Sequence, residues 1–95
     1  MQMEQQMQRL LVSGRVQQVG YRDWMVRKAQ SLGITGWVRN LTDGRVEMVA
    51  AGEEQALAAF VEAGREGPRL ARIDAIDVHP ASERPMKGFT KRFTA

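Results

Sequence analysis

The chain has 95 residues, enough for a single domain with one apolar core. Hydrophobic residues make up 43% of the sequence and charged residues 26%, a balance typical of a globular protein rather than a disordered one. Because cysteine is absent, a disulfide framework, a thiolate metal site and a thiol nucleophile are excluded. The single histidine, His79, leaves no partner for a His-rich metal site or a Ser-His triad.

The charge balance and the lack of long apolar runs bear on partners and location. No apolar run approaches the roughly 20 residues of a membrane helix, and no signal-peptide pattern is visible, so we expect a cytosolic protein with no membrane partner. Basic residues outnumber acidic ones 14 to 11, for a net charge of +3. This excess fits a solvated surface, and it also fits attraction to anions from small phosphates to nucleic acid. Charge alone leaves both interpretations open.

The N-terminal part of the chain predicts a short tail and then a strand. Residues 1–6 (MQMEQQ) lack any hydrophobic period, so we expect them to be disordered ahead of a single domain over 7–95. A strand is predicted over 7–13, where β-forming residues run up to a Ser-Gly pair. We expect Leu10 and Val12 to face the core.

A glycine-bounded loop and a helix follow this strand. The segment 14–20 (GRVQQVG) has glycine at both ends and predicts a loop. A helix is predicted over 21–32, with Gly33 as its C-terminal stop. Its apolar residues recur at helical spacing and form one stripe: Tyr21, Trp24, Met25, Ala29 and Leu32.

The middle of the chain predicts a β-hairpin. Two β-rich segments, 34–41 and 45–52, flank an Asp43-Gly44 pair, and Asp-Gly is a strong signal for a tight hairpin turn. Trp37 falls on the opposite face of its strand from the apolar Ile34 and Val38. We therefore expect Trp37 to pack on the sheet face rather than to contact a substrate.

The remaining elements complete an α+β pattern. A second helix is predicted over 53–65, a strand over 71–79 with a bulge between Ala75 and Ile76, and a final short strand over 89–93. The order β-α-β-β-α-β favours a ferredoxin-like sandwich, with an antiparallel sheet of four or five strands and both helices on one face. This fold hosts enzymes and binding proteins alike, so it settles no function.

The loop between the first strand and the first helix carries more polar chemistry than its connection requires. A strand-to-helix turn can aim several backbone N–H groups into one concavity, and the helix N-terminus adds about half a positive charge there. Arg22, in the first helical turn, can add a two-pronged donor for a tetrahedral anion. An arginine at this position is also commonly just solvated, so the residues alone leave the anion site open.

Two long motifs give this loop a context. GRVQQVGYR (14–22) and GWVRNLTDGRV (36–46) resemble the signature pair of the acylphosphatase family, G-R-V-Q-G-V-x-[FY]-R and G-x-V-x-N-x-x-D-G-x-V. The resemblance covers nearly the whole chain, including its length, the order of elements and the terminal F-x-x-R-aromatic pattern.

The resemblance implies a reaction and a site. Members of the family hydrolyse acyl phosphates to a carboxylate and inorganic phosphate, without a metal or other cofactor. The resemblance implies that Arg22 is the substrate-binding arginine and that Asn40 is the asparagine that orients the attacking water. A carboxylate leaving group is weakly basic, so the reaction needs no general acid, and we expect Asp23 to point away along the helix. The partner would be a small acyl phosphate, and we expect a monomer. The phosphate cradle would be formed by Arg15, Val16, Gln17, Gln18, Val19, Gly20, Tyr21 and Arg22.

Two positions depart from the family pattern. Gln18 stands where glycine is usual, and a positive φ there would cost about 1 kcal/mol and disturb the cradle. Lys91 stands where an apolar residue is frequent, and we interpret it as an edge-strand lysine. The alternative function is an anion- or RNA-binding module in which Gln18 has weakened or abolished catalysis. Nucleic acid is the less favoured partner, because the predicted first and third strands carry no aromatic residue for base stacking and only Trp37 is available.

Overall fold

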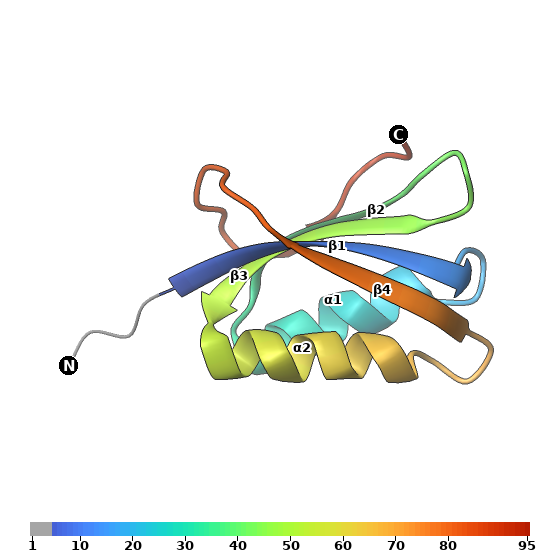
Figure 1. Cartoon of the computed structure of the whole chain (residues 1–95), viewed down its shortest axis with the longest axis horizontal. Helices are drawn as coiled ribbons and strands as arrows, with labels where there is room; N and C mark the ends of the chain where they lie inside the picture. The colour runs from blue at the N-terminus through green and yellow to red at the C-terminus, as the bar shows by residue number, and fades with distance from the viewer. Residues whose placement is uncertain (1–4) are drawn as a thin grey trace.

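The computed structural model describes residues 5–95 and contains five strands and two helices (Figure 1). Residues 1–4 of the tail expected to be disordered lie outside this range. Gln5 and Gln6 belong to the first strand and pair with the third, so the expectation of disorder is wrong for them. In chain order the elements are β1 (Gln5–Arg15), α1 (Tyr21–Leu32), β2 (Thr35–Asn40), β3 (Val46–Glu53), α2 (Glu54–Glu66), β4 (Arg72–Pro80) and β5 (Phe89–Lys91).

The strands form one sheet in the order β4-β1-β3-β2-β5, and both helices cover the same face, as predicted (Figure 1). The first four strands pair antiparallel, whereas β5 runs parallel to β2, so the sheet is mixed and the expectation of a fully antiparallel sheet is wrong for β5. The register explains this direction. Pro80, where β4 ends, lies in the same cross-strand row as Gly36 and Phe89, near the starts of β2 and β5. The loop 81–88 therefore delivers the chain into β5 already pointing along β2.

The predicted boundaries are close to the observed ones. Helix α1 spans the predicted residues, and Gly33 ends it in the left-handed conformation with φ of 70°. The predicted bulge in β4 is present but lies at Asp74, because Ser13 pairs with Ala75 and the next residue pairs with Ile73. No helix within residues 5–95 is both long enough and apolar enough to cross a membrane.

The core lies between the sheet and the two helices. Leu10 and Val12 are fully buried there, as predicted. The rings of Phe60 and Phe89 meet edge to face at 5.4 Å, which fixes β5 against α2. Full burial of each large side chain of this kind contributes about 1.5–3 kcal/mol.

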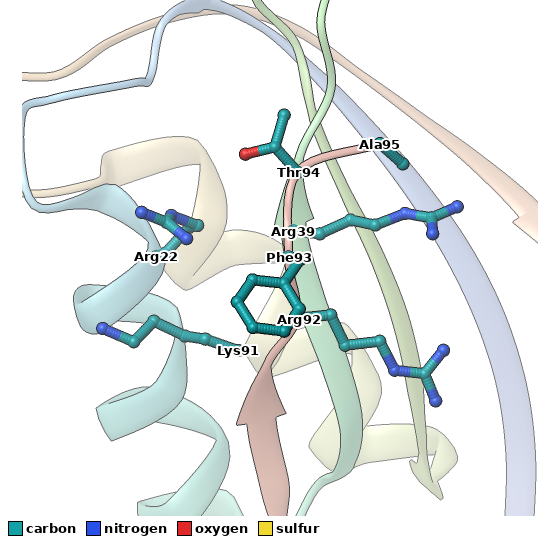
Figure 2. Close-up of a pocket in the computed structure, with 7 residues that line it drawn as sticks. All are labelled: Arg22, Arg39, Lys91, Arg92, Phe93, Thr94 and Ala95. Carbon is teal, nitrogen blue, oxygen red and sulfur yellow. The ribbon is translucent and has the colours of Figure 1, made fainter.

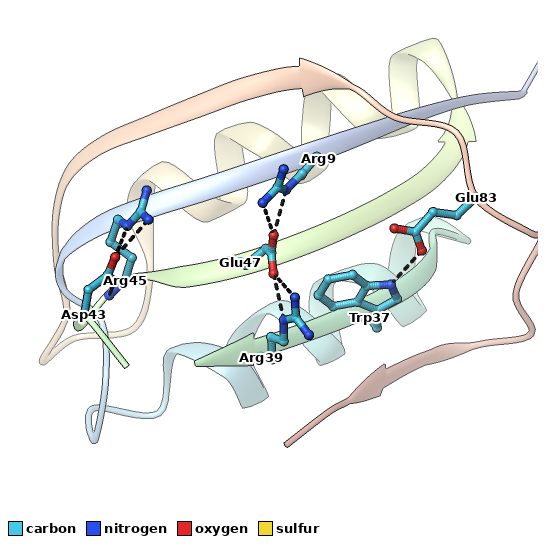
Figure 3. Close-up of polar contacts among 7 residues, drawn as sticks. All are labelled: Arg9, Trp37, Arg39, Asp43, Arg45, Glu47 and Glu83. Carbon is cyan, nitrogen blue, oxygen red and sulfur yellow. Dashed lines mark hydrogen bonds and ion pairs between the residues drawn. The ribbon is translucent and has the colours of Figure 1, made fainter. Parts of the chain in front are cut away.

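The other face of the sheet is covered by side chains rather than helices (Figure 3). Glu47 on β3 is buried there and accepts hydrogen bonds of 2.7 Å from Arg9 on one side and Arg39 on the other. Trp37 lies beside them, only 3% exposed, and donates its indole N–H to Glu83 at 3.2 Å. Trp37 thus packs on the sheet face, as predicted.

The β2–β3 hairpin closes through the predicted Asp-Gly turn. The Asp43 carboxylate accepts the backbone N–H of Arg45 at 3.0 Å and pairs with its guanidinium (Figure 3), and Gly44 has a positive φ of 96°. The backbone N–H of Leu41 donates to Arg45 at 2.8 Å. This turn fixes the end of β2, where Asn40 lies.

Candidate active site

The loop that joins β1 to α1, residues 16–20, is anchored by its valines. Val16 is buried in the core and Val19 packs partly against it. Two of the residues in this short loop, Gln18 and Gly20, have left-handed backbone angles, with φ of 62° and 81°. The chain can therefore turn sharply from the strand into the helix, and Gln18 does adopt the positive φ that glycine usually supplies.

Gln17 ties this loop to the hairpin. Its side-chain amide nitrogen donates to the backbone oxygens of Leu41 at 2.8 Å and Arg45 at 2.9 Å. The amide nitrogen has two N–H groups, so both are used. The loop is thereby held beside the end of β2, next to Asn40.

The first turn of α1 leaves its backbone donors free for a ligand. Its first backbone hydrogen bond runs from Trp24 to Gly20 at 3.0 Å, so the N–H groups of the three residues between them have no acceptor within the helix. Within residues 5–95, no side chain caps this turn, since the N-cap residue is Gly20. These donors and the partial positive charge of the helix end favour an anion.

The loop and the helix end surround a small hollow of about 110 Å³. It is lined by Val16, Gln18, Gly20, Tyr21, Arg22, Asp23 and Lys91. A larger hollow of about 690 Å³ adjoins it and is shown in Figure 2. Its lining residues are Arg22, Arg39, Lys91, Arg92, Phe93, Thr94 and Ala95. Arg22 and Lys91 line both hollows, and Arg22 forms no ion pair within the described chain.

Asn40 is the last residue of β2. Its side-chain oxygen is buried and has no hydrogen-bond partner among residues 5–95. By strand alternation it shares the helix-covered face with the buried Val38. Its backbone oxygen accepts the N–H of Ala95 at 3.0 Å, and Ala95 lines the larger hollow. Asn40 itself lines neither hollow, so the structure brings it to the border of the site rather than into it.

None of the other cradle candidates places a charged side chain in either hollow. The side chains of Val16 and Tyr21 are buried, and the Tyr21 hydroxyl donates to Gly64 at 3.0 Å. Burial raises the pKa of Tyr21, so this hydroxyl keeps its proton. Arg15 is exposed at the end of β1 and does not line either hollow. Among the cradle candidates, Arg22 is therefore the one whose charged side chain lines both hollows.

An ion pair at the rim was not predicted from the sequence. The Lys91 ammonium lies 2.8 Å from the Asp23 carboxylate, and both residues line the small hollow. The expectation that Asp23 points away from the site is therefore wrong. The hydrogen bond from Lys91 holds the pKa of the Asp23 carboxyl below its ordinary value. An acid in the first turn of α1 and a lysine at an often apolar position were the available signals, but sequence alone does not pair them.

The single histidine lies away from both hollows. His79 pairs with Arg9 across β4 and β1, far along these strands from the loop end at Arg15. Residues 5–95 hold no group of three or more His, Cys, Asp or Glu side chains able to bind a metal ion. The metal requirement of the reaction stays a prediction.

Comparison with known proteins gives this geometry a family. The Acylphosphatase family profile matches residues 8–93. An acylphosphatase of Thermus thermophilus is 51% identical over 79 residues, covering 83% of this chain and 90% of the relative. An acylphosphatase of Acidiphilium cryptum is 48% identical over 86 residues, covering 90% of this chain and 93% of the relative. The crystal structure of acylphosphatase from Bacillus subtilis superposes with a TM-score of 0.88 at 37% identity, over 94% of this chain and 99% of that one.

The chain belongs to the acylphosphatase family, as its two motifs predicted. It is an enzyme of that family, and family and fold together support acyl phosphate hydrolysis. The alternative of a binding module without catalysis is not favoured by these relatives.

Proposed function

We propose that the chain hydrolyses the carboxyl-phosphate bond of acyl phosphates at the small hollow, without a metal or other cofactor. The observation that supports this most is the meeting of the uncapped first turn of α1 and the unpaired Arg22 at one hollow. The substrate is a small acyl phosphate whose phosphate group enters that hollow.

The phosphate is held by backbone donors and one guanidinium. The N–H groups of residues 15–22, which include the loop 16–20 and the start of α1, surround the phosphate oxygens, and Arg22 donates two parallel hydrogen bonds to them. Each charge-assisted contact contributes about 1.5–3 kcal/mol. These contacts favour an anionic phosphate group over a neutral one.

Asn40 is proposed to hold the attacking water. Its buried side-chain oxygen has no partner in the described chain, so it can accept a hydrogen bond from water. The Gln17 bonds keep the end of β2 beside the loop, and therefore keep this water near the phosphorus.

The reaction needs positioning and charge more than acids or bases. Water attacks phosphorus, the bond from phosphorus to the acyl oxygen breaks, and its electron pair leaves with the carboxylate. The water proton passes to a phosphate oxygen. The transition state is loose and places charge on the peripheral oxygens, where the backbone donors and Arg22 stabilise it.

The direct test is release of inorganic phosphate from benzoyl phosphate in the presence of a metal chelator. We expect turnover well above the spontaneous rate and unchanged by the chelator. No turnover with or without added metal ions would overturn the proposed activity. Turnover that the chelator abolishes and a metal restores would overturn its metal independence.

A further inference from the structure

Lys91 lines the candidate site but has no role in the reaction proposed above. It projects from β5, lines both hollows and pairs with Asp23 of α1 at 2.8 Å. Figure 2 shows the side chains of Arg22 and Lys91 extending to the same side of the C-terminal segment. These two cations therefore mark the boundary where the small hollow opens into the larger one.

The other two cations of the larger hollow are engaged elsewhere. Arg39 donates to Glu47 at 2.7 Å. Arg39 and Arg92 also lie over the ring of Trp37, at 4.8 Å and 4.5 Å from its centre. In Figure 2 both guanidinium groups extend away from Arg22. Of the four cations that line the larger hollow, Arg22 and Lys91 are the two that also line the small one.

The Lys91 ammonium has donors to spare. An ammonium has three N–H donors, and within residues 5–95 its partner is the Asp23 carboxylate. The contact with Asp23 uses one of these donors and leaves the others free for a ligand. A substrate oxygen can therefore bind Lys91 without breaking the contact with Asp23.

We propose that Lys91 is a further substrate-binding residue, which donates a hydrogen bond to the carboxyl oxygens of the acyl phosphate. This inference rests on the proposed function. If the phosphate occupies the small hollow, the acyl group extends into the adjoining larger one. The scissile bond then lies at the boundary, and the carboxyl oxygens face the Lys91 ammonium.

Lys91 acts through charge and keeps its proton. As the bond from phosphorus to the acyl oxygen breaks, its electron pair moves onto the carboxylate. The ammonium stabilises this growing negative charge, and the weakly basic carboxylate does not need to be protonated. Replacing Lys91 should therefore lower kcat/KM most for the substrates whose leaving carboxylate is most basic.

The experiment measures kcat/KM for a series of ring-substituted benzoyl phosphates with leaving acids of different pKa. Lys91→Met should lower kcat/KM for benzoyl phosphate by about tenfold or more. It should also make the rate depend more steeply on the pKa of the leaving acid. Lys91→Arg should restore most of the rate. Lys87→Met, at an exposed lysine that lines neither hollow, is the matched control and should match the wild type.

Asp23→Asn separates substrate binding from a structural role of the ion pair. This variant loses the ion pair but keeps the ammonium. Its kcat/KM should therefore depend on the pKa of the leaving acid with the same slope as in the wild type. The inference is overturned if Lys91→Met has the wild-type slope, or if Asp23→Asn reproduces its full loss of rate. A wild-type protein that releases no phosphate would instead overturn the proposed function.

Discussion

Gln18 is held in the left-handed backbone region, with φ of 62°, because the buried Val16 and the packed Val19 fix the loop on both sides. An L-residue in this region costs roughly 1–2 kcal/mol, a penalty that glycine avoids. This cost falls on the loop that surrounds the small hollow, and substitution of Gln18 measures it.

Gln18→Gly is expected to raise the free energy of unfolding by about 1 kcal/mol, because it relieves the positive φ. Gln18→Ala is the matched control, since it removes the same side chain but keeps the Cβ. Urea denaturation of the three proteins measures the difference. Equal stability of the Gly and Ala variants would show that the backbone angle costs nothing.

Arg22→Ala should weaken inhibition by inorganic phosphate about tenfold or more, because the guanidinium is the charged side chain proposed to bind it. Loss of kcat/KM for benzoyl phosphate should be at least as large. Arg27→Ala, at an exposed arginine of the same helix that lines neither hollow, serves as the control. Near-wild-type phosphate binding by Arg22→Ala would refute its role.

Asn40→Ala should lower kcat by on the order of 100-fold, because the attacking water loses its orientation. Inhibition by inorganic phosphate should change little, since Asn40 is proposed to hold water and not the phosphate. Steady-state kinetics with phosphate as inhibitor separates the two effects. An unchanged kcat would remove Asn40 from the mechanism.

At the scale of the elements, β1, β2 and β3 are joined by a charged contact on the open face of the sheet. Burial opposes ionisation of Glu47, but the hydrogen bonds from Arg39 and Arg9 outweigh it and lower its pKa below the ordinary 4.5. A carboxyl whose pKa is lower in the folded state stabilises the fold above its ordinary pKa. That stability is lost as the pH falls through the folded-state value.

Glu47→Gln is therefore expected to flatten the fall in stability as the pH is lowered from neutral through the ordinary Glu47 pKa of 4.5 and below it. It should also cost about 2 kcal/mol at neutral pH, because two arginines then face an uncharged amide. Urea denaturation across this pH range is the measurement. Some pH dependence should remain from Asp23 and Asp43, whose pKa values are also lowered. A full wild-type pH profile in the variant would contradict this account.

The elements that sequence predicted best are those set by local signals. Helix α1 followed from one apolar stripe and Gly33, and the hairpin followed from Asp43-Gly44. The direction of β5 did not follow from any local signal, because its parallel pairing with β2 depends on the end of the sheet at which the loop 81–88 crosses. Local periodicity carries no information on that crossing.

For the candidate site too, sequence predicted the local features but not the contacts between distant residues. The motif placed the loop and Arg22 together, and the structure brings them to one hollow. The contact between Lys91 and Asp23 joins residues far apart in the chain, and it depends on β5 lying beside α1. The Gln17 bonds to the hairpin likewise required the folded arrangement.

At the scale of the whole molecule, three distant segments meet at one end of the sheet. The loop 16–20 is tied to the hairpin by Gln17, and the C-terminal segment is tied to Asn40 through Ala95. We propose that this arrangement supplies phosphate donors, a water-binding amide and a hollow for the acyl group. The monomeric state and the cytosolic location stay predictions from the sequence.

In the proposed mechanism, water attacks phosphorus while residues 15–22 hold the phosphate. This mechanism is tested most directly by hydrolysing benzoyl phosphate in water labelled with heavy oxygen and analysing both products by mass spectrometry. Attack at phosphorus places the label in inorganic phosphate and leaves benzoate unlabelled. Label in the benzoate would mean that water attacks the carbonyl carbon, which would contradict the roles proposed for the cradle, Arg22 and Asn40.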